Sequence, residues 1–189
     1  MIHLNSHQLR QSTIKEGSRH QKNGGKNPLI IVLDNVIDTY NIGSFFRLAD
    51  ALNAQKICLC GPVVTPPNLK IHRASIGTWK WVCWQHFPDT IDCLLKLKKD
   101  GYTIYACEQA KNSVIYTKTK YKFPLVIVAG NENTGISSNV LKLCDQIIEV
   151  PMYGINKSLN VLLATAIIGY QALSSFPTTR YTPSPHTKP

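Results

Sequence analysis

The sequence predicts an α/β fold in which a parallel sheet is flanked by helices, and three observations lead to it. Segments such as PLIIVLDNV (28–36) and PLVIVAG (124–130) are apolar throughout, as is typical of strands covered on both faces. Other segments carry apolar residues at helical spacing. The two kinds of segment alternate along the chain, which favours parallel strands joined by helices. The 189 residues show no internal repeat and match the usual size of one domain.

The first strand, 28–36, is followed by a predicted helix at 41–53 (NIGSFFRLADALN). Its apolar side chains recur at helical spacing and indicate a face that packs on the sheet. Gly43, Ser44 and Arg47 are expected on the opposite face of this helix, away from the core.

The middle of the chain begins with a strand at 56–61 (KICLCG). Residues 63–84 mix polar, basic and aromatic side chains and are expected to form a long connection. A helix is predicted within 89–101 (DTIDCLLKLKKDG), with Asp89 or Thr90 as its N-cap and Gly101 just past its end.

The second half continues the alternation. SSNVLKLC (137–144) is a predicted short helix with a serine start, and SLNVLLATAIIGYQALSS (158–175) is a long apolar helix that is expected to be buried, with Ser158 as its N-cap. The remaining predicted strands are 102–108, 124–130 and 146–152.

The charge balance indicates a polyanionic partner. Lys and Arg number 21 against 11 Asp and Glu, which gives a net charge of +10 and a pI near 9.4. Such a surplus favours nucleic acid through counterion release. With 43% hydrophobic residues the chain can bury a core. No apolar run is long enough to span a membrane, no polybasic amphipathic helix is evident, and the first twenty residues lack the apolar core of a signal peptide.

The six cysteines are interpreted as reduced core thiols of a cytoplasmic protein. None forms a Cys-x-x-Cys pair, and most lie in apolar stretches. His72 and His86 lie near Cys83 without a ligand pattern, so no metal site is predicted.

Three regions are predicted along the chain: a basic N-terminal arm at 1–27, one α/β domain at 28–175, and a flexible proline-rich tail at 176–189. The arm is open to two interpretations, a solvated tail or a segment that contacts RNA.

Ligands of parallel sheets collect at the carboxyl ends of the strands, so the loops after the strands are the candidate site. The first loop leads from Asn41 to Arg47, whose guanidinium suits a phosphate or carboxylate. The second, GNENTG (130–135), resembles neither a Walker loop, because Ile136 stands where a lysine is required, nor a dinucleotide fingerprint. Glu132 in this turn would repel phosphates and better suits a cationic or hydroxyl-bearing ligand.

The third loop, 150–160, follows a strand and leads into the last helix, where free N–H groups could bind polar atoms of a ligand. Each loop alone is also compatible with an ordinary connection. Together and in this order, NVIDTYNIGSFFRLADAL, LVIVAGNENTGIS and IIEVPMYGINKSLNVLLATAIIGYQ resemble the three motifs of the SpoU (TrmH-like) RNA methyltransferases of the SPOUT superfamily. The resemblance covers roughly residues 29–173.

The resemblance implies an S-adenosylmethionine-dependent RNA ribose 2′-O-methyltransferase acting on tRNA or rRNA. It also implies a homodimer with the active site near the subunit interface, and a C-terminal part that forms a deep trefoil knot, which sequence physics alone would not suggest. Two departures are Gly77-Thr78-Trp79, where the family often has Gly-Ala-Glu, and the continuation of the third motif as Asn160-Val-Leu-Leu-Ala164.

The motifs assign residues to roles. The match gives catalytic roles to Asn41, Arg47, Glu132, Ser158 and Asn160. It gives S-adenosylmethionine contacts to Ala106, Cys107, Gly130, Asn131, Gly135, Val150, Met152, Ser158 and Leu159. The candidates for RNA contact are Arg47, Lys70, Arg73 and Lys80, with Lys22, Lys26, Trp79 and Trp81 as further ones. Core packing is the alternative for both tryptophans.

The hypothesis for catalysis is that Arg47 clamps the phosphate of the target nucleotide and polarises its 2′-hydroxyl. The proton then passes to a phosphate oxygen or to a transiently neutral Arg47. Three alternatives are a SPOUT enzyme that methylates a base, a silent RNA-binding protein with this fold, and a dinucleotide oxidoreductase, which the missing fingerprint disfavours.

Overall fold

The computed structural model describes residue 8 and residues 25–176 of the chain. Most of the predicted arm at 1–27, including Lys22, and nearly all of the predicted tail at 176–189 therefore lie outside the described residues. Among the described residues, no helix has the length and apolar character needed to cross a bilayer.

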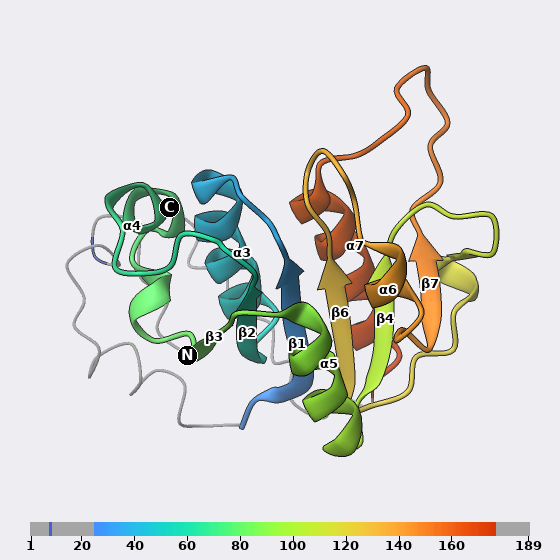
Figure 1. Ribbon diagram of the computed structural model, residues 1–189, viewed down its shortest axis with the longest axis horizontal. Helices are drawn as coiled ribbons and strands as arrows, with labels where there is room; N and C mark the ends of the chain where they lie inside the picture. The colour runs from blue at the N-terminus through green and yellow to red at the C-terminus, as the bar shows by residue number, and fades with distance from the viewer. Residues whose placement is uncertain (1–7, 9–24, 177–189) are drawn as a thin grey trace, which may run out of the picture.

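The described chain forms a seven-stranded parallel sheet with helices on both faces, as predicted (Figure 1). The strands are β1 (Asn27–Asp34), β2 (Ala54–Cys60), β3 (Trp84–Phe87), β4 (Thr103–Cys107), β5 (Val114–Ile115), β6 (Leu125–Ala129) and β7 (Gln146–Glu149). Their order across the sheet is β3-β2-β1-β6-β4-β7-β5. The helices are α3 (Thr39–Ala51), α4 (Leu69–Ser75), α5 (Thr90–Lys99), α6 (Ser138–Leu141) and α7 (Val161–Ser174), with 3-10 turns η1 (Thr78–Lys80) and η2 (Tyr116–Lys118).

Two apolar cores account for the arrangement. Alternate residues of the central strands point to opposite faces, so that one face packs on α3 and α7 and the other on α5 and α6. In β1, for example, Ile31 and Leu33 belong to the first core, whereas Ile30 and Val32 belong to the second. The continuous apolar runs of β1 and β6 reflect burial on both sides.

The prediction of a single connection at 63–84 was wrong, because this segment contains α4 and η1 and ends on the first residue of β3. Asn68 caps α4, with its Oδ1 accepting from the amides of Lys70 (2.9 Å) and Ile71 (3.2 Å). A seven-residue helix gives too little periodicity to be recognised, and β3 is an edge strand without a fully buried residue.

Gly43 is buried, contrary to the prediction that it faces away from the core. A Cβ at this position would lie 2.6 Å from the Cβ of Ala74 and 2.8 Å from the carbonyl oxygen of Ile71. The glycine thus allows α3 and α4 to pack with their backbones close together.

The last helix begins at Val161, and its N-cap is Asn160 rather than the predicted Ser158. Asn160 Oδ1 accepts from the amides of Leu162 (2.9 Å) and Leu163 (3.4 Å). The helix is also less buried than predicted, because Leu163, Ile167 and Tyr170 on one side of it are exposed.

The cysteines are free thiols, and Cys58, Cys60 and Cys93 are buried, as expected. Cys83 is exposed, contrary to the expectation of a core position. The described residues contain no cluster of three or more metal-ligating side chains.

Candidate active site

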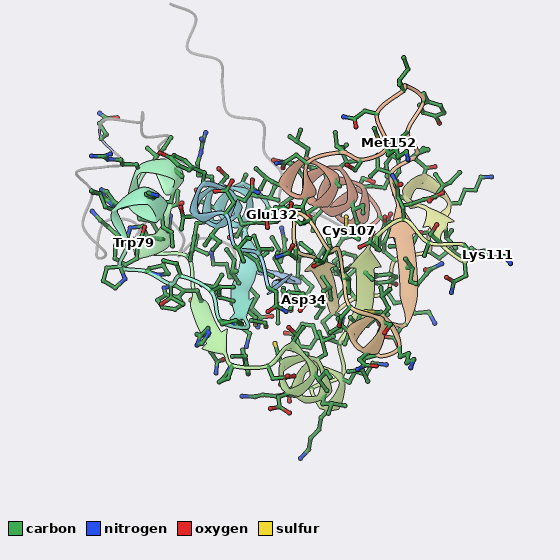
Figure 2. The ribbon with its side chains drawn as sticks, turned by 45° about the horizontal axis from the view of Figure 1, so that its top comes forward. Asp34, Trp79, Cys107, Lys111, Glu132 and Met152 are labelled. Atoms are coloured by element: carbon green, nitrogen blue, oxygen red, sulfur yellow. The ribbon has the colours of Figure 1, made fainter. Side chains whose placement is uncertain are left out.

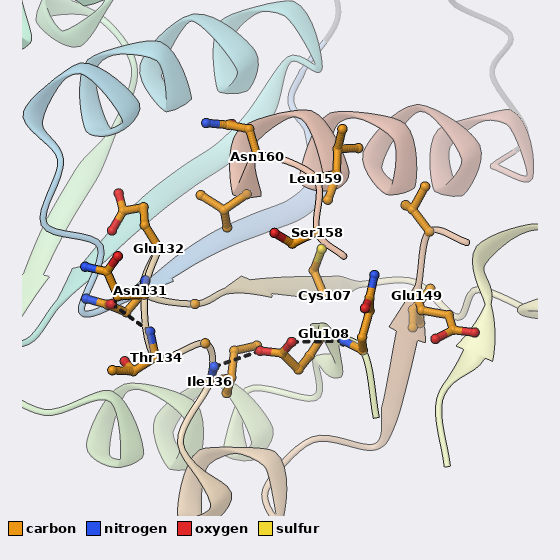
Figure 3. A pocket seen from close by; sticks show the side chains of 18 of the residues that line it. Cys107, Glu108, Asn131, Glu132, Thr134, Ile136, Glu149, Ser158, Leu159 and Asn160 are labelled. Carbon is orange, nitrogen blue, oxygen red and sulfur yellow. Dashed lines mark hydrogen bonds between the residues drawn. The ribbon is translucent and has the colours of Figure 1, made fainter. Parts of the chain in front are cut away.

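A cavity of about 700 Å³ lies at the carboxyl ends of β4, β6 and β7 (Figure 3). This volume is within the range that holds cofactor-sized ligands. The cavity is bounded by the loop after β4, the turn after β6, the end of β7 and the segment that enters α7. The lining residues are Cys107–Gln109, Gly130–Ile136, Leu141, Ile148–Val150, Ser158–Val161 and Ala164.

The turn after β6 is held in shape by Asn131. Its Oδ1 accepts from the amides of Asn133 (2.9 Å) and Thr134 (3.1 Å), and its Nδ2 donates to the carbonyl of Asn35 (2.7 Å). The backbone of Asn131 is also bridged to Gly135. The second loop is therefore bound to the loop that follows the neighbouring strand β1.

Glu108 is a cavity residue that the sequence analysis missed. Its Oε2 accepts from the amide of Ile136 (2.9 Å) and its Oε1 from the amide of Gln109 (2.9 Å). A Cβ on Gly135, which has a φ of +67°, would lie 2.4 Å from this Oε2. Glu108 thereby ties the loop after β4 to the turn after β6, and Gly135 leaves the space for it.

Glu132, Asn41 and Asn160 connect the three motif loops. Asn41 Nδ2 donates to Glu132 Oε1 (2.8 Å), and Asn160 Nδ2 donates to Asn41 Oδ1 (3.3 Å). The Glu132 carboxylate also accepts from the amides of Ile37 and Asp38, each at 3.2 Å. The sequence prediction that these three side chains belong together is consistent with this geometry.

Glu132 is held in its charged form. Partial burial alone would raise its pKa, but the hydrogen bonds from Asn41 and from backbone amides outweigh burial and place the pKa of Glu132 below its usual value. Burial raises the pKa of the Cys107 thiol to about 12, so this side chain faces the cavity as a neutral group.

The predicted cofactor residues are divided between the cavity and its surroundings. Those that line the cavity are Cys107, Gly130, Asn131, Gly135, Val150, Ser158 and Leu159. Ala106 is fully buried in the sheet, and Met152 lies on the loop between Val150 and Ser158, outside the lining (Figure 2). This loop extends away from the body of the molecule, and its Tyr153 and Ile155 are almost fully exposed (Figure 1).

Arg47 is not part of the cavity lining. It lies on α3 six residues after Asn41, which is about 9 Å along the helix axis. Its side chain is exposed and forms no ion pair with the described residues.

The predicted RNA-contacting residues lie mainly on α4 and η1. Lys70 and Arg73 are exposed, and Lys80 is half-buried. Trp81 is buried and its Nε1 donates to Asp50 (2.8 Å), so core packing is the correct interpretation for this tryptophan. Trp79 is half-buried, with its Nε1 donating to His72 Nδ1 (3.1 Å).

The charge of the cavity is opposite to that of the whole chain. Three carboxylates line it, from Glu108, Glu132 and Glu149, and it has no lining Lys, Arg or His. An acidic cavity in a chain of charge +10 favours a ligand with positive charge and disfavours phosphates.

Lys26, a further candidate for RNA contact, does not line this cavity. It is half-buried, and this burial lowers the pKa of its ammonium group.

Residues 28–170 match the SpoU rRNA Methylase family. The chain belongs to the SpoU methylase family. This SpoU methylase is 34% identical over 145 residues to the tRNA (guanosine(18)-2′-O)-methyltransferase of Aquifex aeolicus, a match that covers 76% of this chain and 68% of the relative. The corresponding enzyme of Thermus thermophilus is 31% identical over 144 residues, covering 76% and 73%.

Among the solved structures that resemble this SpoU methylase are two RNA-modifying enzymes. The A. aeolicus TrmH/SpoU tRNA modifying enzyme has a TM-score of 0.75 at 30% identity and covers 86% of this chain and 81% of its own. The AdoMet-bound rRNA methyltransferase of Sinorhizobium meliloti has a TM-score of 0.74 at 27% identity, and the match covers 90% of this chain but 61% of the longer one. The predicted family, the α/β fold with a parallel sheet, and the class of S-adenosylmethionine-dependent RNA methyltransferase are confirmed.

Proposed function

We propose that this SpoU methylase transfers a methyl group from S-adenosylmethionine to a ribose 2′-hydroxyl of structured RNA. The observation that carries the proposal is the acidic cavity beside the Glu132–Asn41–Asn160 hydrogen bonds. A sulfonium cofactor suits carboxylates, whereas a dinucleotide with its phosphates does not. The names of the Aquifex and Thermus relatives, both tRNA 2′-O-methyltransferases, make tRNA the first RNA to test.

The cofactor contacts follow from the cavity. We propose that Gly130, Asn131 and Gly135 present backbone groups to the bound cofactor, because a glycine turn permits close approach. Cys107, Val150 and Leu159 supply apolar and neutral surface, and Ser158 supplies a hydroxyl. Ala106 is buried in the sheet next to Cys107 and supports this side of the cavity. Met152 would reach the cofactor only if its loop moves inward.

The proposed reaction forms a bond between the 2′-oxygen and the methyl carbon while the bond from sulfur to that carbon breaks. Bound S-adenosylmethionine supplies a methyl group that is activated by its positive sulfur. Arg47 binds the phosphate of the target nucleotide, and the hydroxyl proton passes to a phosphate oxygen or to a transiently neutral Arg47. Asn41 and Ser158 orient the ribose and Arg47, while Glu132 holds Asn41 in place.

We propose that the active form is a homodimer. The exposed side of α7 carries Leu163, Ile167 and Tyr170, which are spaced to form one apolar face. Arg47 lies outside its own cavity lining, so a second copy that supplied it would complete the site. We also propose the family's trefoil knot in the C-terminal part; the packing of α7 against β4 and β6 is compatible with it. The free thiols favour a cytoplasmic location.

The deciding experiment is methyl transfer from labelled S-adenosylmethionine to tRNA and, separately, to rRNA that lacks ribose methylation, followed by nucleoside mass spectrometry. A 2′-O-methylnucleoside confined to one RNA class is expected. A methylated base would indicate a base-methylating SPOUT enzyme. Binding of both ligands without transfer would indicate a silent RNA-binding protein and would contradict the proposal.

Replacement of Arg47 by Ala tests the assignment of the catalytic arginine. Turnover should fall by about 100-fold or more, since misplacement of the reacting groups by 1 Å costs about that much. Binding of S-adenosylmethionine, measured by calorimetry, should be unchanged because Arg47 does not line the cavity. Arg47→Lys controls for charge and should recover little turnover, because a lysine cannot bind a phosphate with two parallel hydrogen bonds. Loss of cofactor binding in Arg47→Ala would contradict the assignment.

A further inference from the structure

Residues 118–123 (KTKYKF) form a basic segment between η2 and β6 in which exposed and inward side chains alternate. Lys118, Lys120 and Lys122 are exposed, whereas Thr119 is buried and Tyr121 is half-buried. Lys118 ends η2, and the backbone becomes extended at Thr119. The alternation of exposed and inward residues along the segment leaves all three ammonium groups in solvent. We call these three residues the lysine stripe.

The backbone under the lysine stripe is held by two tyrosines, Tyr105, which is buried, and Tyr121, which is half-buried. Tyr105 Oη accepts from the amide of Lys122 (2.8 Å), and Tyr121 Oη donates to the carbonyl of Tyr116 (3.0 Å). The rings of Tyr105 and Tyr121 are in contact, with centroids 5.4 Å apart. The stripe therefore has a defined backbone before any ligand binds, which lowers the entropic cost of binding.

Few acidic groups accompany the lysine stripe. Residues 109–124 contain four lysines and no Asp or Glu. The positive charge of Lys122 contributes to the lowered pKa of Asp145, and Asp145 Oδ1 forms an ion pair with Lys98 Nζ (2.9 Å). Within residues 25–176, neither Lys118 nor Lys120 has an acidic partner in an ion pair.

One segment of the chain leads from the cavity to the lysine stripe. The segment that leads to it starts at Gln109, which lines the cavity, and passes through Lys111, which is exposed at the outer margin of the molecule (Figure 2). It continues through β5 and η2 at the edge of the sheet and then runs back to the start of β6 (Figure 1). Basic side chains thus extend along this edge from the cavity towards the opposite end of the strands.

We propose that the lysine stripe binds the phosphate backbone of the RNA substrate at a distance from the target nucleotide; this inference rests on the proposed function. The three exposed lysines are each separated by one less exposed residue, so the stripe offers closely spaced point charges. It has no exposed aromatic or apolar side chain among them, which suits repeated phosphates rather than bases or a protein surface. The binding is sequence-independent and is driven by counterion release.

The test is the salt dependence of RNA binding by the full chain with Lys118→Gln and Lys120→Gln combined. Binding to bulk tRNA is measured without cofactor over a series of salt concentrations. Each lost phosphate contact should reduce the slope of log K against log salt by roughly 0.7 to 0.9, so the double variant should lose roughly 1.5. In methyl transfer, KM for RNA should rise while kcat at saturating RNA is unchanged.

The matched control is Lys96→Gln with Lys99→Gln on α5, which removes the same charge from exposed positions on the other face of the sheet. An unchanged slope in the control together with a reduced slope in the stripe variant supports the proposal. Equal changes in both variants, or no change in the stripe variant, overturn it. Absence of methyl transfer by the wild type concerns the proposed function alone, because the binding slopes are measured without catalysis.

Discussion

At the scale of single residues, the site depends on a few groups that bond backbone amides across loops. Glu132 accepts from the backbone amides of Ile37 and Asp38 and from the side-chain amide of Asn41. Glu108 accepts from the backbone amide of Ile136. Hydrogen bonds to a charged acceptor are each stronger than neutral ones, and loss of the acceptor leaves the donors without partners. These residues therefore act mainly by fixing loop positions.

Replacement of Glu132 by Gln should make stability less dependent on pH. The pKa of Glu132 is lowered in the folded state, so its contribution to stability is present above the ordinary value of 4.5 and is lost as the pH falls through the lower, folded value. The difference in melting temperature between wild type and variant should therefore be clear at pH 7 and should shrink below about pH 4. A difference that stays constant over a melting series from pH 7 to pH 3 would contradict this origin.

Gly135→Ala should weaken cofactor binding and stability together. The positive φ alone costs about 1 kcal/mol, and the new Cβ would also collide with Glu108. Gly101→Ala is the control, because Gly101 has a φ of +84° but open space around it. Thermal melts of both variants separate the cost of the positive φ from the cost of the collision with Glu108. Equal destabilisation of the two variants would show that the collision does not contribute.

At the scale of elements, the position of the N-cap of α7 determines which residues of the third motif face the active-site cavity. Asn160 ends the loop, caps α7 and donates to Asn41, so one side chain has a structural and a positioning role. Asn160→Asp keeps an acceptor for the cap but loses the donor. Stability should be retained, with methyl transfer reduced, whereas Asn160→Ala should also lose about 1 kcal/mol of stability. Thermal melts and turnover of both variants check this, and unchanged turnover in Asn160→Asp would contradict the positioning role.

The sequence was sufficient to predict the helices and strands that are long and have a strong apolar pattern. Strands β1 and β6 are buried on both faces, so their apolar runs were unambiguous, and Asp89 was correctly predicted as a candidate cap of α5. The sequence was insufficient for α4, β3 and β5, which are short or lie at the edges of the sheet. Glu108 was missed because its partner amide lies 28 residues away, and no local pattern encodes such a contact.

At the scale of the whole molecule, the exposed face of α7 is the surface expected to mediate dimer formation. Leu163→Glu should produce a monomer in light scattering and should lower methyl transfer, because a charge in an apolar interface is costly. Leu95→Glu on α5 is a closely matched control, since Leu95 is 50% exposed and Leu163 is 51% exposed. A dimer that persists in Leu163→Glu would exclude this face as the interface.

The two outer strands of the sheet have a further consequence, for aggregation. The outermost strands, β3 and β5, contain only four and two residues. An outer strand offers unpaired amides and carbonyls to a strand of another molecule, and short outer strands leave few of them. The lysines that follow β5 add electrostatic repulsion at that side. Growth of intermolecular β-sheet is therefore disfavoured at both ends, and concentrated protein should resist forming amyloid-like fibres.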